Sequence, residues 1–358
     1  MELSVCIITK NEKNKLEQCL KALQGLDVEI VVVDTGSTDG TKEMAAGYTD
    51  RIFDFVWQDD FSLARNYAAE KASYDMIMML DSDEYVQKMD MASIEKAVRD
   101  NPGKVGRIRR INSLDRGGEG QEISEYISRI YDRTLYHYEG RIHEQVTPIR
   151  DNGGDGKWDI KAYQTDIVVL HDGYCGSEEE MQKKIKRNIT MLLRELKEEE
   201  QKDDPYLLYQ LGKSYYVAGE YEDAIAAFDR VLCQDLNPKL EYVIDMIQAY
   251  GYSLLKAGRT EQALSLEGVY EEFGGTADFR FLMGLIYMNN GLFDRAVEEF
   301  LRATKAKSAY TKGADSYLAY YNAGVICECR GDLKRAAEYY GKCGSYQRAQ
   351  ERLVSIKS

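Results

Sequence analysis

The second half of this 358-residue chain repeats one pattern of small residues. Four times, a glycine is followed by a second glycine seven positions later and by an alanine twelve positions later. The four sets are Gly212, Gly219 and Ala224; Gly251, Gly258 and Ala263; Gly284, Gly291 and Ala296; and Gly324, Gly331 and Ala336. The first glycine and the alanine let two helices touch, and the second glycine relieves the turn between them. The pattern therefore predicts stacked helix–turn–helix units that bury a continuous core between neighbours.

The spacing of these sets indicates the class of repeat. Successive sets start 39, 33 and 40 residues apart, and an aromatic residue follows the alanine by four positions in three of them, at Phe228, Phe300 and Tyr340. A helical repeat of about 34 residues with this pattern is typical of a tetratricopeptide array, here a degenerate one with insertions. Such arrays present a concave surface to an extended segment or an amphipathic helix of a partner. Self-association of the chain into a homo-oligomer through the array is the alternative.

The first half follows a different pattern, in which short apolar runs alternate with helical segments. Residues 4–8, 29–33 and 76–80 are apolar runs bounded by polar or turn residues, as in buried parallel strands. Residues 14–23 place apolar side chains at helical spacing. We expect a Rossmann-like α/β domain, a parallel sheet with helices on both faces, followed by an all-α repeat domain. The predicted boundaries are 1–175 for the α/β domain, 176–203 for a charged, solvated connecting helix and 204–358 for the repeats.

Composition narrows the classes of function. The net charge of −14 argues against a general binder of nucleic acids or of anionic membranes. No apolar run reaches the roughly 18 residues of a membrane span, and residues 3–8 resemble a strand rather than a signal peptide. The seven cysteines are an odd number without metal-ligand spacing, as in a reducing compartment. We therefore expect a cytoplasmic protein with no membrane span and no nucleic-acid partner.

The first chemical signal is the sequence Asp81-Ser82-Asp83, which directly follows the apolar run 76–80. It lies at the carboxyl end of a predicted strand, where ligands bind in open α/β sheets. Residues two apart in extended backbone point the same way, so both carboxylates can face one ligand. A hard divalent cation such as Mg²⁺ or Mn²⁺ would offset their repulsion and could bridge to a diphosphate. A cap at the start of a loop is the alternative.

Other polar segments follow or precede the predicted strands. Residues 32–41 are VVDTGSTDGT, residues 59–66 are DDFSLARN, and residues 80–84 are LDSDE. With these segments in this order, the chain resembles the family 2 glycosyltransferases of the GT-A fold, and within them the members whose catalytic domain is followed by tetratricopeptide repeats. That group includes bacteriocin peptide S-glycosyltransferases and related protein glycosyltransferases. The resemblance covers essentially the whole chain and implies that a nucleotide-sugar is the donor.

The resemblance implies donor-binding roles for residues near the strand ends. Thr9 and Asp34 are expected to hold the uracil end of a UDP-sugar, and Asn11 is grouped with them. A turn or helix-cap role is the alternative for Asp34. Arg65 is expected to contact the nucleotide or its phosphate through a charge-assisted hydrogen bond, while Asn66 beside it braces the loop.

The resemblance also implies how the Asp-Ser-Asp motif works. Asp81, with Ser82 beside it, is expected to bind the ribose, and Asp83 is expected to bind Mn²⁺ or Mg²⁺. His171 begins the segment HDGY after a further predicted strand. It is expected to complete the metal shell or to contact the diphosphate.

The catalytic base is expected in the segment GRIHE at residues 140–144. An inverting transfer needs a side chain that takes the acceptor's proton as the acceptor attacks the sugar. The resemblance favours Glu144 for this task, with His143 orienting the base or the acceptor.

Together these residues imply an inverting, metal-dependent hexosyltransferase that moves a sugar from a UDP-sugar to a Ser/Thr oxygen or a Cys sulfur of a peptide or protein. A saccharide acceptor, or a non-catalytic repeat scaffold with a degenerate transferase domain, is the alternative. A nucleotidyltransferase would carry a glycine-rich loop after the first strand, and residues 9–12 contain no glycine. The glycine-rich segments 116–120 and 151–156 are expected to be loops that close over the donor.

Overall fold

The computed structural model describes residues 2–114, 121–149, 160–171, 178–198, 202–306 and 309–357. The loops expected at 116–120 and 151–156 lie outside those ranges. The chain divides into two compact units, Met1–Met191 and Leu192–Ser358, and each is described by itself. Within the described ranges, no helix combines the length and the apolar character needed to cross a bilayer.

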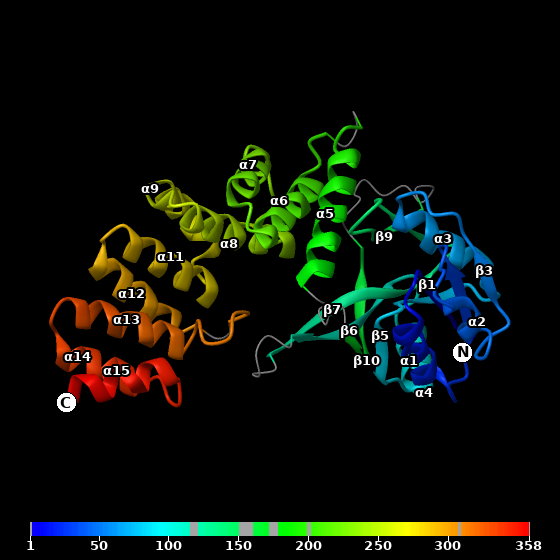
Figure 1. Cartoon of the computed structure of the whole chain (residues 1–358), viewed down its shortest axis with the longest axis horizontal. Helices are drawn as coiled ribbons and strands as arrows, with labels where there is room; N and C mark the ends of the chain where they lie inside the picture. The colour runs from blue at the N-terminus through cyan, green and yellow to red at the C-terminus, as the bar shows by residue number, and fades with distance from the viewer. Residues whose placement is uncertain are drawn as a thin grey trace. The chain divides into compact units, whose positions relative to one another are not determined.

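An eight-stranded sheet forms the centre of the N-terminal unit (Figure 1). Its strand order is β3-β2-β1-β4-β7-β6-β10-β5. The strands are β1 (Ser4–Thr9), β2 (Glu29–Asp34), β3 (Ile52–Asp54), β4 (Met76–Asp81), β5 (Glu84–Lys88), β6 (Val105–Leu114), β7 (Gln121–Asp132) and β10 (Ala162–His171). A separate antiparallel pair consists of β8 (Tyr136–Glu139) and β9 (Gln145–Pro148).

The sheet is mixed: the predicted parallel pairing holds for β3, β2, β1 and β4 and again for β6 with β10, and the other strand pairs are antiparallel. The first four strands in the order, β3, β2, β1 and β4, are parallel to one another. β7 runs antiparallel to both β4 and β6, and β5 runs antiparallel to β10. Only six residues of the chain separate β6 from β7, too few for the crossover that a parallel pair needs, so the two strands pair antiparallel.

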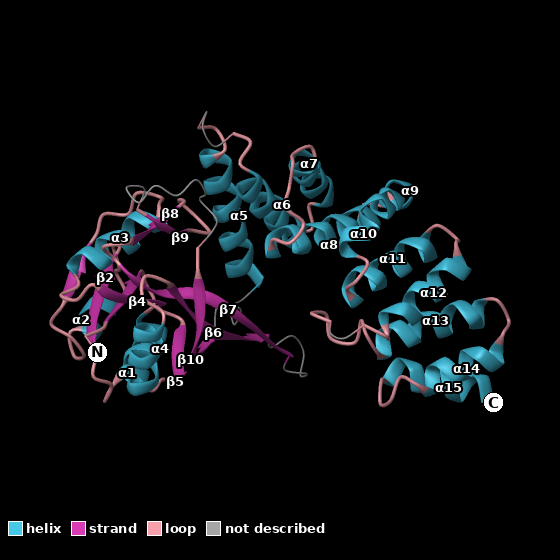
Figure 2. Cartoon of the chain, turned by 180° about the vertical axis from the view of Figure 1, so that it is seen from behind, coloured by secondary structure: helices cyan, strands magenta, loops and turns pink. Residues whose placement is uncertain are grey.

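Helices cover both faces of the sheet, as expected (Figure 2). Because successive side chains of a strand point to opposite faces, Val5 and Ile7 of β1 enter one hydrophobic cluster while Cys6 and Ile8 enter another. The first cluster contains buried side chains of α1, α2 and α4, and the second those of α3. These helices are α1 (Lys13–Leu23), α2 (Thr41–Ala45), α3 (Phe61–Lys71) and α4 (Met91–Asp100). A further helix, α5 (Glu178–Glu195), follows β10.

The C-terminal unit is wholly helical in its regular structure and follows the predicted repeats. Its elements are α6 (Pro205–Ala218), α7 (Tyr221–Leu232), α8 (Glu241–Lys256), α9 (Thr260–Ala263), η2 (Leu264–Val269), α10 (Tyr270–Phe273), α11 (Ala277–Asn289), α12 (Phe293–Ala303), α13 (Tyr317–Cys329), α14 (Leu333–Gly341) and α15 (Gln347–Lys357). In the second repeat, two short α-helices and a 3₁₀ segment replace the second long helix. This is the repeat that lacks the aromatic residue after its alanine.

The small residues lie at helix contacts, as predicted. A Cβ atom added at Gly212 would lie 2.4 Å from the ring of Phe228, and one added at Gly284 would lie 2.6 Å from the ring of Phe300. Gly219 ends α6 with a φ of 80°, a conformation that residues with a side chain rarely adopt. The glycines therefore fix both the packing distance and the turn of a repeat.

Candidate active site

Neighbouring strand ends bring the polar motifs of the N-terminal unit to one edge of the sheet. Thr9, at the end of β1, pairs with Asp34 at the end of β2. Ile8 pairs with Asp81, the last residue of β4. Ser82 follows Asp81 at the same edge and is buried. The carboxyl ends of these parallel strands therefore lie side by side, at the place where α/β sheets bind ligands.

Asp34 uses one carboxylate oxygen to form the turn after β2. Its Oδ1 accepts hydrogen bonds from the backbone N–H groups of Gly36 at 2.9 Å and Ser37 at 2.8 Å. Asp34 Oδ2 and Thr9 Oγ1 are buried and have no hydrogen-bond partner within the described ranges. Buried polar atoms in proteins are nearly always hydrogen-bonded, so two such atoms on paired residues indicate a place for a ligand. The turn role and a ligand role are thus compatible.

Asn11 connects the end of β1 to the same turn. Its Oδ1 accepts a hydrogen bond from the N–H of Thr38 at 2.8 Å, and its own N–H donates to Ser37 Oγ at 2.8 Å. Its φ of 54° is in the left-handed region, which asparagine tolerates better than most residues. These contacts give Asn11 a bracing role, and its contact with a donor stays a prediction.

A network of buried charges joins three of the predicted site residues. Arg65 on α3 contacts Asp81 Oδ1 through Nη2 at 2.7 Å and Glu144 Oε1 through Nε at 2.5 Å. Arg129 on β7 contacts Asp81 Oδ2 at 2.6 Å and Glu84 Oε1 at 2.9 Å through its Nη2. The side chains of Arg65 and Arg129 are 6% and 8% exposed, and that of Glu84 is fully buried. Two guanidinium groups and three carboxylates therefore form one connected cluster.

The cluster fixes the charge of Asp81. Burial raises the pKa of this carboxyl, but Arg129 and Arg65 outweigh burial and hold the pKa well below its usual range. Asp81 is therefore a permanent negative charge with one guanidinium group on each oxygen, and it does not transfer protons. The ribose contact expected of Asp81 and Ser82 stays a prediction.

No role was assigned to Arg129 or to Glu84 from the sequence. Arg129 lies in the middle of a strand, 48 residues from its partner Asp81, and no motif surrounds it. Glu84 follows the Asp-Ser-Asp motif and accepts a hydrogen bond from the N–H of Asp81 at 3.0 Å. Arg65, expected to contact the nucleotide, uses Nε and Nη2 in its ion pairs, while its buried Nη1 has no partner in the described part of the chain.

The hairpin of β8 and β9 carries the predicted base. Asn66 of α3 holds this hairpin by donating to the carbonyl of Tyr138 and accepting from its N–H, both at 2.9 Å, which agrees with the bracing role expected of it. In the turn, His143 has a φ of 54°, and burial lowers the pKa of its imidazole. Its buried Nε2 lacks a hydrogen-bond partner among the residues described. A strained, neutral histidine beside Glu144 is a candidate for contact with substrate.

Asp83 and His171 form the pair best suited to hold a metal ion. His171 Nε2 lies 3.6 Å from Asp83 Oδ1. His171 Nδ1 lies 2.7 Å from Asn112 Oδ1, and Asn112 donates through Nδ2 to Glu125 Oε1 at 2.7 Å. Asn112 thus holds the His171 ring through Nδ1 and leaves Nε2 facing Asp83, so that Nε2 is the nitrogen that would be available to a metal ion.

Asp83 and His171 suit a metal ion that takes most of its ligands from substrate phosphates and water. In the ranges that the structure describes, no group of three or more His, Cys, Asp or Glu side chains is placed to hold a metal. Mg²⁺ is often held by only one or two protein carboxylates and completes its shell with substrate phosphates and water. The two side chains are therefore compatible with an ion that binds together with a diphosphate.

Comparison with known sequences gives the family of each unit. Residues 4–153 match the family described as glycosyl transferase family 2. Residues 190–240, 250–311 and 281–342 match the tetratricopeptide repeat. The chain combines a family 2 glycosyltransferase domain with tetratricopeptide repeats. The GT-A-like fold and the repeat array expected from the sequence are thereby confirmed.

Proteins similar to this chain include two transferases and a solved structure. The SPbeta prophage-derived glycosyltransferase SunS of Bacillus subtilis is 25% identical over 301 residues, which cover 80% of this chain and 67% of that protein. A dolichol-phosphate mannosyltransferase of Pyrococcus furiosus is 35% identical over 91 residues, 23% of this chain and 26% of that protein. The crystal structure of MamA covers 50% of this chain and 95% of its own at 20% identity, with a TM-score of 0.40.

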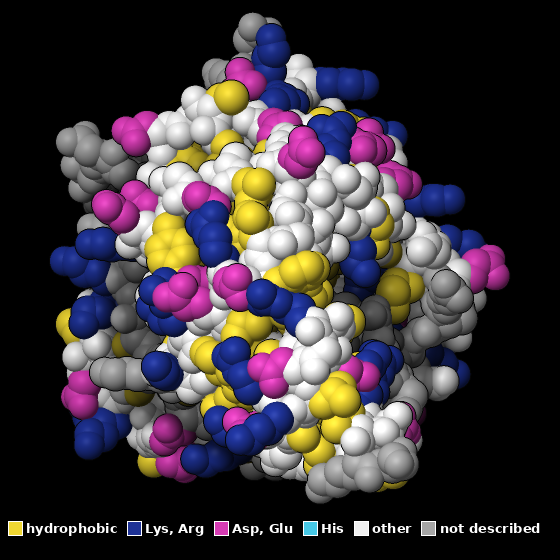
Figure 3. Space-filling model, turned by 90° about the vertical axis from the view of Figure 1, so that its left-hand side faces the viewer, with side chains coloured by type: hydrophobic (Ala, Val, Ile, Leu, Met, Phe, Trp, Pro, Cys, Tyr) yellow, Lys and Arg dark blue, Asp and Glu magenta, His cyan; other side chains and the backbone are white. Residues whose placement is uncertain are grey.

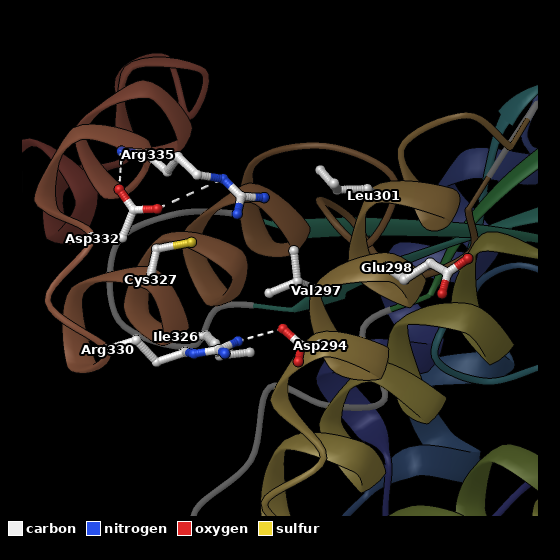
Figure 4. Close-up of a pocket in the computed structure, with 9 residues that line it drawn as sticks. All are labelled: Asp294, Val297, Glu298, Leu301, Ile326, Cys327, Arg330, Asp332 and Arg335. Carbon is white, nitrogen blue, oxygen red and sulfur yellow. Dashed lines mark hydrogen bonds and ion pairs between the residues drawn. The ribbon is translucent and has the colours of Figure 1, made fainter.

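The repeats carry a surface pocket of their own, between α12 and the α13–α14 pair (Figure 4). Its volume is about 450 Å³, and its apolar lining includes Val297 and Ile326. Charged residues at this pocket are paired, because Arg330 bonds to Asp294. Acidic and basic side chains also alternate with hydrophobic ones over the face seen in Figure 3. The pocket therefore lacks the unpaired polar groups that mark the glycosyltransferase domain.

Proposed function

We propose that this protein is an inverting, metal-dependent glycosyltransferase that moves a sugar from a UDP-sugar to a peptide or protein acceptor bound by the repeats. The observation that carries the proposal is the pair of buried, unpartnered atoms Asp34 Oδ2 and Thr9 Oγ1, at the strand edge that also bears Asp81. The family of the domain supports glycosyl transfer. The proposal goes further than the family in three respects: it names a UDP-sugar as the donor, a bound metal ion, and a peptide as the acceptor.

In this proposal the donor lies along the carboxyl ends of β1, β2 and β4. The uracil N–H would donate to Asp34 Oδ2, and Thr9 Oγ1 would bond to the base beside it. Asp83 and His171 would hold Mn²⁺ or Mg²⁺, which when bound neutralises part of the charge of the diphosphate. Asp81, Ser82 and Asn11 would complete the contacts of the nucleotide.

Transfer itself requires a base and an oriented acceptor. As the acceptor's oxygen or sulfur forms its bond to the anomeric carbon, the bond from that carbon to the β-phosphate oxygen breaks and the electron pair leaves with UDP. Glu144 would take the acceptor's proton, and its contact with Arg65 at 2.5 Å fixes the position of the carboxylate. His143, neutral because burial lowers its pKa, would orient the acceptor.

The repeats supply the acceptor site in this proposal. A concave array of helices suits an extended peptide segment or an amphipathic helix. Binding at a distance from the chemistry would hold the nucleophile near the sugar and turn a weak encounter into a positioned one. Two alternatives remain, namely transfer to a saccharide and a scaffold that transfers no sugar. Each of them predicts a different result from transfer to a peptide.

The test is release of UDP from a panel of UDP-sugars, with Mn²⁺ and with EDTA. We expect slow hydrolysis of one donor that EDTA stops, and a loss of about 100-fold or more in Asp83→Asn. Asp75→Asn is the matched control, because Asp75 pairs with Arg133 and its side chain is 61% exposed. EDTA-resistant release, unchanged in Asp83→Asn, contradicts the metal assignment. Absence of both UDP release and UDP binding in calorimetry contradicts the transferase assignment and favours the scaffold.

A further inference from the structure

Lys184 and Arg187 are cationic side chains of α5 that have no carboxylate partner in the part of the chain that the structure describes. Within the described ranges, neither Lys184 nor Arg187 forms an ion pair, and Arg187 bonds only to Asn188 Oδ1 beside it. Both side chains are accessible to solvent, and a spacing of three residues puts them on one face of the helix. Lys183, which precedes Lys184, differs from these two because it pairs with Glu179 at 2.8 Å. One face of α5 therefore presents positive charge that the fold leaves unneutralised.

That face is directed at the candidate active site. The guanidinium carbon of Arg187 lies 5.4 Å from the ring centre of Phe61, the first residue of α3. Phe61 is itself tied to the turn between β8 and β9, because its N–H donates to the carbonyl of Arg141 at 2.8 Å. α5 thus places a cation beside the N-terminus of the helix that carries Arg65 and beside the turn that carries His143.

The electrostatics of the neighbouring groups agree with this position. Burial is the main cause of the lowered pKa of His143, and the charge of Arg187 lowers it further. Burial raises the pKa of Asp83, while His171 and, more weakly, Lys184 lower it. Burial raises the pKa of Glu12 as well, and Lys184 is among the cations that act against this effect. Arg187 is therefore close to the hairpin of β8 and β9, and Lys184 lies three residues before it on the same helix.

Three arginines near this edge already have carboxylate partners in the described part of the chain. Arg65 and Arg129 bond to Asp81, and Arg110 bonds to Glu125 at 2.8 Å. A leaving nucleoside diphosphate gains negative charge as its bond to the sugar breaks, and Asp83 adds a further negative charge beside it. One divalent ion does not offset this sum, so additional positive charge at the site stabilises the departing group.

We propose that Lys184 and Arg187 of α5 bind the diphosphate of the donor and hold it as it leaves. The inference rests on the proposed function, since it concerns the same donor. Arg187 suits this task because a guanidinium group can bond to two phosphate oxygens at once, and Lys184 acts as a point charge. The segment expected to be a solvated connecting helix thus becomes part of the donor site.

The experiment compares uridine, UMP and UDP by calorimetry in saturating Mn²⁺. The variants are Lys184→Gln, Arg187→Gln and their combination, with Lys183→Gln as the control on the same helix. We expect each of the two variants to weaken UDP about tenfold and uridine less than about twofold, because only the phosphate contacts are lost. The control should bind all three ligands like the wild type, and thermal melting should show that every variant is folded.

Each outcome separates the inference from the proposed function. UDP binding that is unchanged in the α5 variants but weakened in Asp83→Asn overturns the role of α5 and leaves the donor site in place. Equal weakening of uridine and UDP also overturns it, because a diphosphate contact cannot act on a ligand without phosphate. A wild-type protein that binds neither UDP nor uridine overturns the proposed function together with the inference.

Discussion

The two units of this chain use charge in opposite ways. In the N-terminal unit the ion pair of Arg65 and Glu144 joins side chains that are 6% and 11% exposed. In the repeats the pair of Arg330 and Asp294 joins side chains that are 49% and 88% exposed. A buried charge is costly to leave without its partner, whereas an exposed charge is compensated by water. The pair of Arg65 and Glu144 therefore depends on both of its members, and the pair of Arg330 and Asp294 does not.

The repeats obtain their stability from shape instead. A glycine of one helix receives the aromatic ring of the next at Gly212 and Phe228, and again at Gly284 and Phe300. These contacts tolerate no added atom, since real Cβ atoms do not approach carbon as closely as 2.6 Å. The comparison teaches that the glycosyltransferase domain tolerates buried charges whose desolvation costs free energy, whereas the repeats are stabilised by close packing of helices.

The largest effect should come from the buried network. We expect Arg129→Ala to destabilise the N-terminal unit by about 3–5 kcal/mol, because Asp81 and Glu84 would remain buried without their shared cation. Urea unfolding followed by circular dichroism measures this. Arg129→Lys keeps the charge and should lose less. A loss below about 1 kcal/mol in Arg129→Ala would show that water replaces the guanidinium group and that the network is not closed.

A smaller effect is expected at a helix contact of the repeats. Gly284→Ala would force a Cβ to within 2.6 Å of the Phe300 ring and should cost about 1–3 kcal/mol. Gly268→Ala is the matched control, because nothing lies within 4 Å of its added Cβ, and it should be neutral or slightly stabilising. The same unfolding measurement compares the two. Equal stability of both variants would mean that the repeats shift to admit the methyl group.

The smallest effect should come from the exposed ion pair. Arg330→Ala removes the partner of Asp294 and should change stability by less than about 1 kcal/mol. Thermal melting at low and at high salt measures the difference. A cost comparable to that of Arg129→Ala would remove the distinction between the two units, because it would show that the surface pairs of the repeats also act as a closed set.

The sequence predicted local patterns better than long-range partners. The repeats were predictable because Gly284, Gly291 and Ala296 carry their meaning in their spacing. The strand-end motifs were predictable for the same reason. Arg129 was not, since its role depends on a contact with Asp81 that only the completed sheet creates. The charged helix α5 was predicted to be a solvated connector, and its proposed role at the donor could not be read from the sequence, because a run of lysine and glutamate has the same composition on a free surface and beside a site.

The split use of Asp34 bears on which base the donor carries. Its Oδ1 is committed to the backbone of its own turn, so a single oxygen remains to meet the nucleotide. That oxygen can only accept a hydrogen bond. Under the proposed donor assignment, uracil satisfies it with the hydrogen on N3, whereas cytosine offers a lone pair at the same place. This single oxygen atom would then select a uridine-linked sugar donor over a cytidine-linked one. Replacing the Asp34 carboxylate by an amide would reverse the selection.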